Sequence, residues 1–306
     1  MDRRGFLRFG AAASALLGTG SGLPAAAAAE NALVQPFHLN YAPHLGLFET
    51  LAGSDPVAQI AFMAEQGFTA FEDNGMRGRS EAEQTRIADA LRDHGMRMGV
   101  FVAHSIGWSE PTLTSGEPGP KQQFLDEIRA SVEVAQRVGA TWMTVVPGVR
   151  HPRLAEGYQT AHLVETLREA AAILEPHDLV MVLEPLNTLR DHPGQFLTHS
   201  PQAYQICRAV DSPACKILFD CYHQQITEGN LLPNLDAAWD EIAYLQVADH
   251  PGRYEPTTGE IHYRNVFAHL YAKGYDGIIG MEHGVSGDGA AGERAVIEAY
   301  RTVDAG

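Results

Sequence analysis

Short β-rich runs alternate with longer helical patterns eight times along this 306-residue chain. The runs predict strands at Phe37–Tyr41, Ala70–Asp73, Met98–His104, Trp142–Val146, Val180–Glu184, Ile217–Asp220, Tyr244–Ala248 and Gly277–Glu282. The intervening amphipathic stretches predict helices, among them Pro56–Glu65, Glu81–Asp93, Lys121–Val138, Ala161–Glu175, Pro201–Val210 and Val266–Ala272. Strands that alternate with helices in this way pair in parallel. Eight such units over residues 30–306 predict one α/β domain, a single (β/α)8 TIM barrel.

Other classes of protein fit the chain poorly. No Gly-x-Gly-x-x-Gly follows the first predicted strand, and no phosphate-binding glycine-rich loop ending in Lys-Ser/Thr is present. The formal net charge of −16 argues against a nucleic-acid or anionic-membrane surface. No stretch reaches the roughly 18 consecutive apolar residues of a membrane span. We therefore expect a small-molecule partner.

The first 29 residues are typical of an export signal. A basic start that contains Arg3 and Arg4 precedes a moderately apolar run and the alanine block Ala25–Ala29. The adjacent arginines, followed soon by Phe6 and Leu7, favour twin-arginine export. The sequence thus predicts a signal peptide at 1–29 that is cleaved near Ala29. It also predicts an encounter with the twin-arginine translocase and a periplasmic location.

Polar side chains stand at the ends of the predicted strands, where barrel enzymes build their sites. They are His38, Asn40, Glu72, Asp73, His104, Glu184, Asn187, Asp220, His223, Gln246, Asp249, Glu282 and His283. Four successive strands in the second half each end on one oxygen-bearing group, namely Glu184, Asp220, Gln246 and Glu282, at separations of 36, 26 and 36 residues. Because neighbouring strands of a closed barrel meet at one mouth, we expect these four groups to form an all-oxygen site.

Such a site suits one divalent metal ion, with Mg²⁺, Mn²⁺ or Co²⁺ fitting better than structural zinc. Without a cation, three clustered carboxylates would repel one another and take up protons. The alternative for any single position is that the side chain caps the following helix, as Asp often does. Four such groups on successive strands favour the metal.

Several other chemistries lack their motifs. The chain has no His-Glu-x-x-His helix of a zinc peptidase and no Gly-x-Ser-x-Gly nucleophile elbow. Of the fourteen histidines, His104 and His223 lie at strand ends and are the better site candidates. The three cysteines, Cys207, Cys215 and Cys221, match no disulfide framework or zinc ribbon, so we predict buried free thiols.

At four stretches the sequence resembles the hydroxypyruvate isomerase family, one of the xylose-isomerase-like barrels that also include ketose 3-epimerases. The stretches are Leu183–Asn187 with Pro193–Thr198, Phe219–Gln225 with Glu228–Gly229, Gln246–Pro256 with Thr258–Tyr263, and Gly280–Glu282. The third is the most specific. Residues 72–76 and 104–108 depart from the family's usual segments.

The resemblance implies roles for particular residues. It implies metal ligands at Glu184, Asp220, Gln246 and Glu282, with Glu184 and Glu282 as the catalytic pair that moves a proton. It further implies that His223 and Arg253 hold substrate oxygens, since an arginine suits a carboxylate or a developing enolate. From the first half of the barrel, His104 and Glu72 are predicted to contact substrate as well.

The resulting hypothesis is a metal-dependent aldose–ketose type isomerase of hydroxypyruvate or a related small hydroxy-carbonyl compound. Its proton transfer would pass through a cis-enediolate. One alternative is a periplasmic sugar 3-epimerase or an enzyme of keto-sugars or keto-glycosides on the same barrel. A non-catalytic sugar-binding or metal-binding barrel is the third possibility. A homo-oligomer of this chain is a further expectation.

Overall fold

The computed structural model describes residues 35–304, which contain eight strands and ten α-helices. The strands are β1 (Asn40–Ala42), β2 (Ala70–Phe71), β3 (Arg97–Met98), β4 (Trp142–Val145), β5 (Val180–Leu183), β6 (Cys215–Asp220), β7 (Ile242–Val247) and β8 (Ile278–Met281). The helices are α1 (Glu49–Ala52), α2 (Pro56–Glu65), α3 (Glu81–Asp93), α4 (Pro118–Val138), α5 (Glu156–Leu174), α6 (Ser200–Val210), α7 (Cys221–Thr227), α8 (Leu231–Ala238), α9 (Tyr263–Ala272) and α10 (Gly289–Val303). The predicted signal peptide at 1–29 lies outside the described residues.

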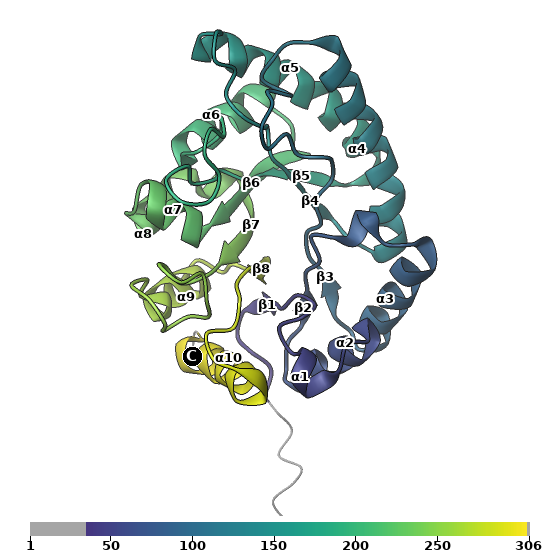
Figure 1. Cartoon of the computed structure of the whole chain (residues 1–306), viewed down its shortest axis with the longest axis vertical. Helices are drawn as coiled ribbons and strands as arrows, with labels where there is room; N and C mark the ends of the chain where they lie inside the picture. The colour runs from purple at the N-terminus through teal and green to yellow at the C-terminus, as the bar shows by residue number, and fades with distance from the viewer. Residues whose placement is uncertain (1–34, 305–306) are drawn as a thin grey trace, which may run out of the picture. The chain divides into compact units, whose positions relative to one another are not determined.

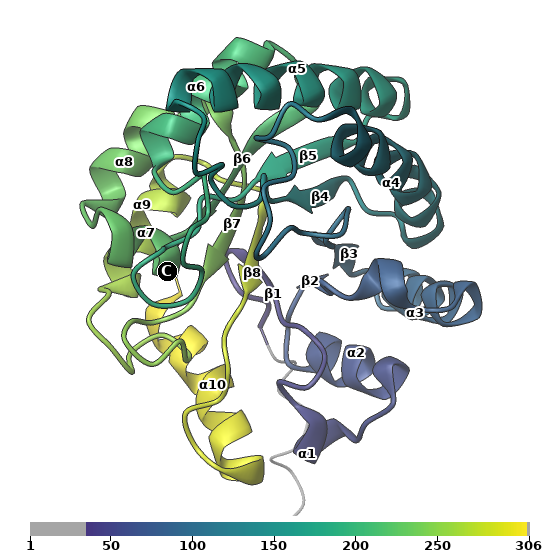
Figure 2. The ribbon, with the colours of Figure 1, turned by 45° about the horizontal axis from the view of Figure 1, so that its top comes forward.

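The strands form a ring, as the alternating pattern predicts. Six parallel strands are bonded in the order β1-β8-β7-β6-β5-β4, and β2 pairs with β3 in parallel. Single bridges between His44 and Glu72 and between Val102 and Thr144 join the two sheets. The helices surround the strands, as Figures 1 and 2 show from two directions. The predicted TIM barrel is therefore confirmed.

Local signals in the sequence explain where the helices begin and end. The Ser80 hydroxyl accepts the Glu83 N–H and caps α3, whereas α4 ends at Gly139, whose φ of 69° lies in the left-handed region that glycine tolerates. Ile87 and Leu91 on α3 and Ile128 on α4 are buried against the strands. These two helices thus cover the barrel with one apolar face each.

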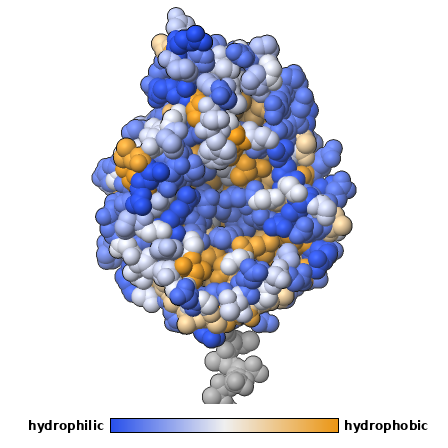
Figure 3. All heavy atoms as spheres, viewed as in Figure 1, coloured by the Kyte–Doolittle hydropathy of each residue, from blue (hydrophilic) through white to orange (hydrophobic). Residues whose placement is uncertain are grey.

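The three cysteines are buried and free, as predicted. Within the described part of the chain, no helix has both the length and the apolar character that crossing a membrane requires. Seen from the direction of Figure 1, hydrophilic side chains occupy the middle of the face, and hydrophobic patches lie above and below them (Figure 3).

Candidate active site

The barrel brings the predicted acidic groups together at the carboxyl ends of β5 to β8. Glu184 follows β5, Asp220 ends β6 and Glu282 follows β8. One oxygen of each, together with a ring nitrogen of His223, lie within 4.8 Å of one another. Gln246 on β7 is the register partner of Asp220 on one side and of Gly280 on the other. Four elements that are distant in sequence therefore converge on one small volume.

Asp220 has two separate tasks in this arrangement. Its Oδ1 accepts the Tyr222 N–H at 2.7 Å and caps α7, which begins at the next residue. Its Oδ2 is buried and accepts no hydrogen bond from any described residue. The capping role considered for such a residue is thus present, and it leaves one oxygen free toward Glu184 and Glu282.

Burial raises the pKa of Glu184 well above its ordinary value, and the nearby Glu282 raises it further. Burial also raises the pKa of Asp220. Carboxylates that are kept out of water and close to one another resist ionisation unless a positive charge is present. The site therefore favours a bound cation.

The tautomer of His223 follows from its neighbours. The Asn187 Oδ1 accepts the N–H groups of Arg190 and Asp191, so the Asn187 amide nitrogen faces His223 Nδ1 at 2.6 Å. Burial lowers the pKa of His223 to about 3, so the ring is neutral, and with Nδ1 accepting, its one proton lies on Nε2. Nε2 is 3.7 Å from a Glu184 oxygen and 3.6 Å from Asp220 Oδ2.

In this tautomer His223 presents a hydrogen-bond donor to the cluster. A donor suits a substrate oxygen, whereas a metal ligand would need the lone pair of Nε2. The Arg253 Nη2 lies 3.4 Å from Nε2, a contact too long to outweigh the shorter one at Nδ1.

Arg253 reaches the cluster from the loop between β7 and α9. Asp249 is fully buried and accepts the N–H groups of Gly259 and Ile261, which fixes this loop. The Arg253 guanidinium donates to Glu282 Oε2 at 2.7 Å and lies over the Tyr222 ring. It is thus a fixed positive charge at the edge of the acidic cluster.

The second oxygen of Glu282 is held by Asn74, whose Nδ2 donates to Oε1 at 2.9 Å. Both oxygens of this glutamate therefore have fixed partners, one from the loop after β2 and one from the loop after β7. A cavity of about 280 Å³ opens beside it and is bordered also by His44 and Glu72. The cavity has room for a small polar ligand next to Glu282.

The structure buries both Glu72 and His104. Both oxygens of Glu72 accept hydrogen bonds, one from Gln246 and one from Tyr244, and burial together with Glu282 raises its pKa to about 8. His104 accepts the Val146 N–H at Nε2, and its Nδ1 faces the Ser105 carbonyl. The substrate contacts predicted for these two side chains stay predictions.

The first strand begins three residues later than predicted and ends one residue later. β1 begins at Asn40, whose side chain donates to the Asp276 carbonyl at the amino ends of the strands. His38 lies before the strand and bonds to Asp304. At the mouth of the barrel, His44 occupies the position expected for His38 and Asn40, and an isolated β-bridge joins it to Glu72. Residues 37–39 misled the prediction because Phe37 and Leu39 are buried without belonging to the strand.

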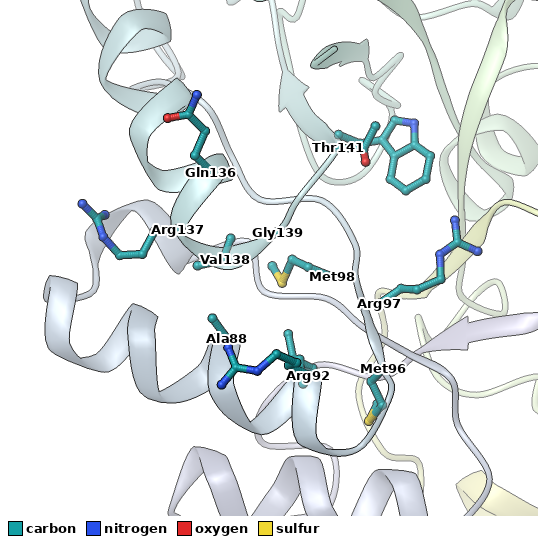
Figure 4. A pocket seen from close by; sticks show the side chains of 12 residues that line it. Ala88, Arg92, Met96, Arg97, Met98, Gln136, Arg137, Val138, Gly139 and Thr141 are labelled. Carbon is teal, nitrogen blue, oxygen red and sulfur yellow. The ribbon is translucent and has the colours of Figure 1, made fainter. Parts of the chain in front are cut away.

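A cavity of about 420 Å³ lies at the opposite ends of the strands, between α3, α4 and the starts of β3 and β4. Its three arginines point in different directions (Figure 4). Each already has a partner: Arg92 bonds to Asp89, Arg97 to the Asp276 carbonyl and Arg137 to Gln84. This cavity holds no convergent polar groups, so the acidic cluster remains the candidate site.

Comparison with known proteins agrees with the barrel fold. The sequence profile of a family described as xylose isomerase-like TIM barrel matches residues 60–303. A crystal structure of an AP endonuclease, family 2, from Brucella melitensis superposes with a TM-score of 0.73 at 26% identity, covering 83% of this chain and 96% of the other. The chain belongs to the xylose isomerase-like TIM barrel family.

Relatives with named activities indicate which enzymes of this family the chain resembles. Hydroxypyruvate isomerase of Escherichia coli (strain K12) is 34% identical over 247 residues, which are 81% of this chain and 92% of the relative. The 2-oxo-tetronate isomerase of Cupriavidus necator is 31% identical over 226 residues, 74% of this chain and 85% of the relative. The predicted relation to the hydroxypyruvate isomerase family, a family of isomerases, is confirmed.

Proposed function

We propose that this protein is a divalent-metal-dependent isomerase of hydroxypyruvate or a related small hydroxy-carbonyl compound. The observation that carries the proposal is the approach of Glu184 and Glu282, from strands on two sides of one mouth, to a common point shared with Asp220. The named activities of the two curated relatives, on hydroxypyruvate and on 2-oxo-tetronate, support a small keto acid as substrate.

The residues present fit a metal ion. Asp220 Oδ2 and Gln246 Oε1 are both buried and both lack a hydrogen-bond partner among the described residues, although such atoms are rarely left unpaired. With one oxygen each from Glu184 and Glu282, they would complete a set of oxygen ligands for Mg²⁺, Mn²⁺ or Co²⁺. When bound, the cation would neutralise the negative charge that develops on two adjacent substrate oxygens.

The chain's own groups then account for the proton transfer. One glutamate of the pair removes a proton from the carbon next to the carbonyl, and the C–H electrons form the double bond of a cis-enediolate. The other glutamate delivers a proton to the former carbonyl carbon, while the enediolate electrons form a new carbonyl at the carbon that lost its proton and the hydroxyl proton passes to the former carbonyl oxygen. The reverse reaction exchanges the roles of Glu184 and Glu282. The His223 Nε2–H donates to a substrate oxygen, and Arg253 binds the carboxylate.

Conservative amide substitutions test this mechanism. Glu184→Gln and Glu282→Gln keep the size and one ligand oxygen but remove the basicity, so turnover at saturating metal should fall by ~10²–10⁴-fold. The matched control Glu133→Gln changes an exposed glutamate on α4 and should leave turnover unchanged. In the wild-type reaction, solvent deuterium should enter the substrate carbon. Wild-type turnover by metal-saturated Glu282→Gln would exclude the two-glutamate mechanism.

A substrate panel separates this function from its competitor, a sugar 3-epimerase or keto-glycoside enzyme. Wild-type protein loaded with Mn²⁺ is assayed with hydroxypyruvate, a four-carbon 2-oxo acid, a ketohexose and a 3-keto-glucoside. We expect turnover of the short acids, because Arg253 offers a positive charge for a carboxylate next to the cluster. Turnover confined to the uncharged sugars would replace this proposal with the competitor.

A further inference from the structure

Glu72 lies beneath the acidic cluster and links two strands across the barrel. It follows β2 and is 1% exposed. The Gln246 Nε2 donates to its Oε1 at 2.7 Å, and the Tyr244 hydroxyl donates to its Oε2 at 2.8 Å. Both donors belong to β7, which is separated from β2 by β8 and β1 in the ring. The contact therefore runs through the barrel interior.

Two glycines leave the space that this arrangement needs. A Cβ at Gly280 on β8 would lie 1.9 Å from Glu72 Oε2, and a Cβ at Gly99 would lie 2.3 Å from the Tyr244 hydroxyl oxygen. Real Cβ atoms do not approach other atoms so closely. A glycine on β8 and a glycine directly after β3 thus leave the room that the Glu72 side chain and its hydrogen-bond donors on β7 occupy.

The amide of Gln246 has a defined direction because of Glu72. The Tyr244 hydroxyl donates to one Glu72 oxygen and the Gln246 Nε2 donates to the other, so the nitrogen end of the amide faces Glu72. The oxygen end, Oε1, is then turned away from Glu72 and is buried with no hydrogen-bond partner within residues 35–304. Asp220, whose Oδ2 likewise has no partner in that range, is the register neighbour of Gln246.

We propose that Glu72 is a positioning residue, which holds the Gln246 amide with its oxygen toward the cation. This inference rests on the metal site of the proposed function. Without Glu72 the amide could present either end to the site, and only the oxygen end binds a hard cation. Groups that orient a metal ligand in this way typically change metal affinity by 10–100-fold when they are mutated.

The first test measures Mn²⁺ binding to the metal-free full chain by calorimetry. Glu72→Gln should raise the Mn²⁺ dissociation constant by about 10- to 100-fold, because an amide can bond to either end of Gln246. Glu72→Asp, which is too short to reach Gln246, should give a similar loss and serves if the first variant does not fold. The control Tyr244→Phe removes the other donor and leaves the Gln246 contact, so its effect should be smaller.

A double-mutant cycle distinguishes positioning from a general loss of negative charge. Gln246→Ala alone should weaken Mn²⁺ binding, and adding Glu72→Gln to it should change the affinity no further. Independent effects in the double variant, or unchanged affinity in both Glu72 variants, would overturn the assignment of Glu72. If the wild-type protein bound no Mn²⁺, the proposed metal-dependent function itself would be overturned. If Gln246→Ala bound Mn²⁺ as tightly as wild type, Gln246 would not be a metal ligand, and Glu72 would not be its positioning residue.

Discussion

His104 shows how burial can settle the charge of a single side chain. The ring is 4% exposed and packs edge-on against Phe124, while both of its nitrogens face backbone groups. Nε2 accepts the Val146 N–H, which requires the neutral form. Burial accordingly lowers the pKa of His104 to about 4 from an ordinary value of 6.5.

This shift predicts a loss of stability in acid. Between pH 6.5 and 4 the unfolded chain binds a proton at His104 and the folded chain does not, so the free energy of unfolding falls as the pH is lowered through this window. The full effect is on the order of 3 kcal/mol. Urea unfolding of wild type and His104→Gln at pH 7 and pH 4.5 measures it, and the variant should lose less stability than wild type.

The control for this experiment is His94→Gln, which changes an exposed histidine at the end of α3. Its pH dependence should equal that of wild type. The other buried histidines remain in all three proteins and cancel from the comparison. Equal acid sensitivity in His104→Gln and wild type would mean that His104 can be protonated without leaving its place.

Among single residues, those that the sequence could predict are the ones that end strands. Glu184, Asp220 and Glu282 follow hydrophobic runs at intervals of one and two strand–helix units, and barrel geometry alone brings them together. Asn74 and Tyr244 had no such signal. Asn74 contacts Glu282 across 208 residues of sequence, and Tyr244 contacts Glu72 across 172, so only the folded barrel reveals these pairs.

At the scale of elements, helices predicted from strong amphipathic patterns agree with the structure, and short ones were missed. The observed bounds of α2 and α3 equal the predicted ones. The helix α7 begins directly after β6 and has seven residues, too few to show a periodic pattern. Its start depends on the Asp220 cap, a role that the sequence allowed for this residue, although the four groups on successive strands favoured a metal ligand.

The strand β8 supplies the next prediction. Gly280 is buried in it, and Gly280→Ala would force the new Cβ into Glu72 and Gln246. Overpacking of this kind typically costs 1–3 kcal/mol of unfolding free energy. Thermal and urea unfolding of the metal-free variant should show that loss, and its Mn²⁺ affinity should fall because Glu72 must move.

The matched control is Gly157→Ala in the first turn of α5, where a Cβ meets nothing within 4 Å. Alanine suits a helix better than glycine, so this variant should be as stable as wild type or up to ~1 kcal/mol more stable. If Gly280→Ala had the same unfolding free energy as Gly157→Ala and the Mn²⁺ affinity of wild type, the close packing around Glu72 would contribute neither to stability nor to metal binding.

At the scale of the molecule, the repeated strand–helix unit predicted the barrel, and the net negative charge argued against a nucleic-acid or anionic-membrane partner. The formal charge of −16 repels anions in general, yet Arg253 stands as a fixed cation beside three carboxylates. A bound divalent ion would add to that local positive charge. Together, Arg253 and such an ion would offset the three carboxylates, so that an anionic substrate is not repelled at the mouth of the barrel.

The last prediction concerns where the whole molecule functions. Arg3 and Arg4, followed by an apolar run and the alanine block, predict export by the twin-arginine route, which carries folded proteins and would allow a metal to bind before transport. The full-length chain with Arg3→Lys and Arg4→Lys should therefore stay in the cytoplasm at its uncleaved size, whereas wild type should appear in the periplasm, cleaved near Ala29. Fractionation and mass spectrometry of the mature amino terminus measure both. The control Arg8→Lys retains the pair and should be exported normally. Periplasmic, cleaved protein from the double-lysine variant would contradict twin-arginine export, and the cation would then have to be acquired after transport.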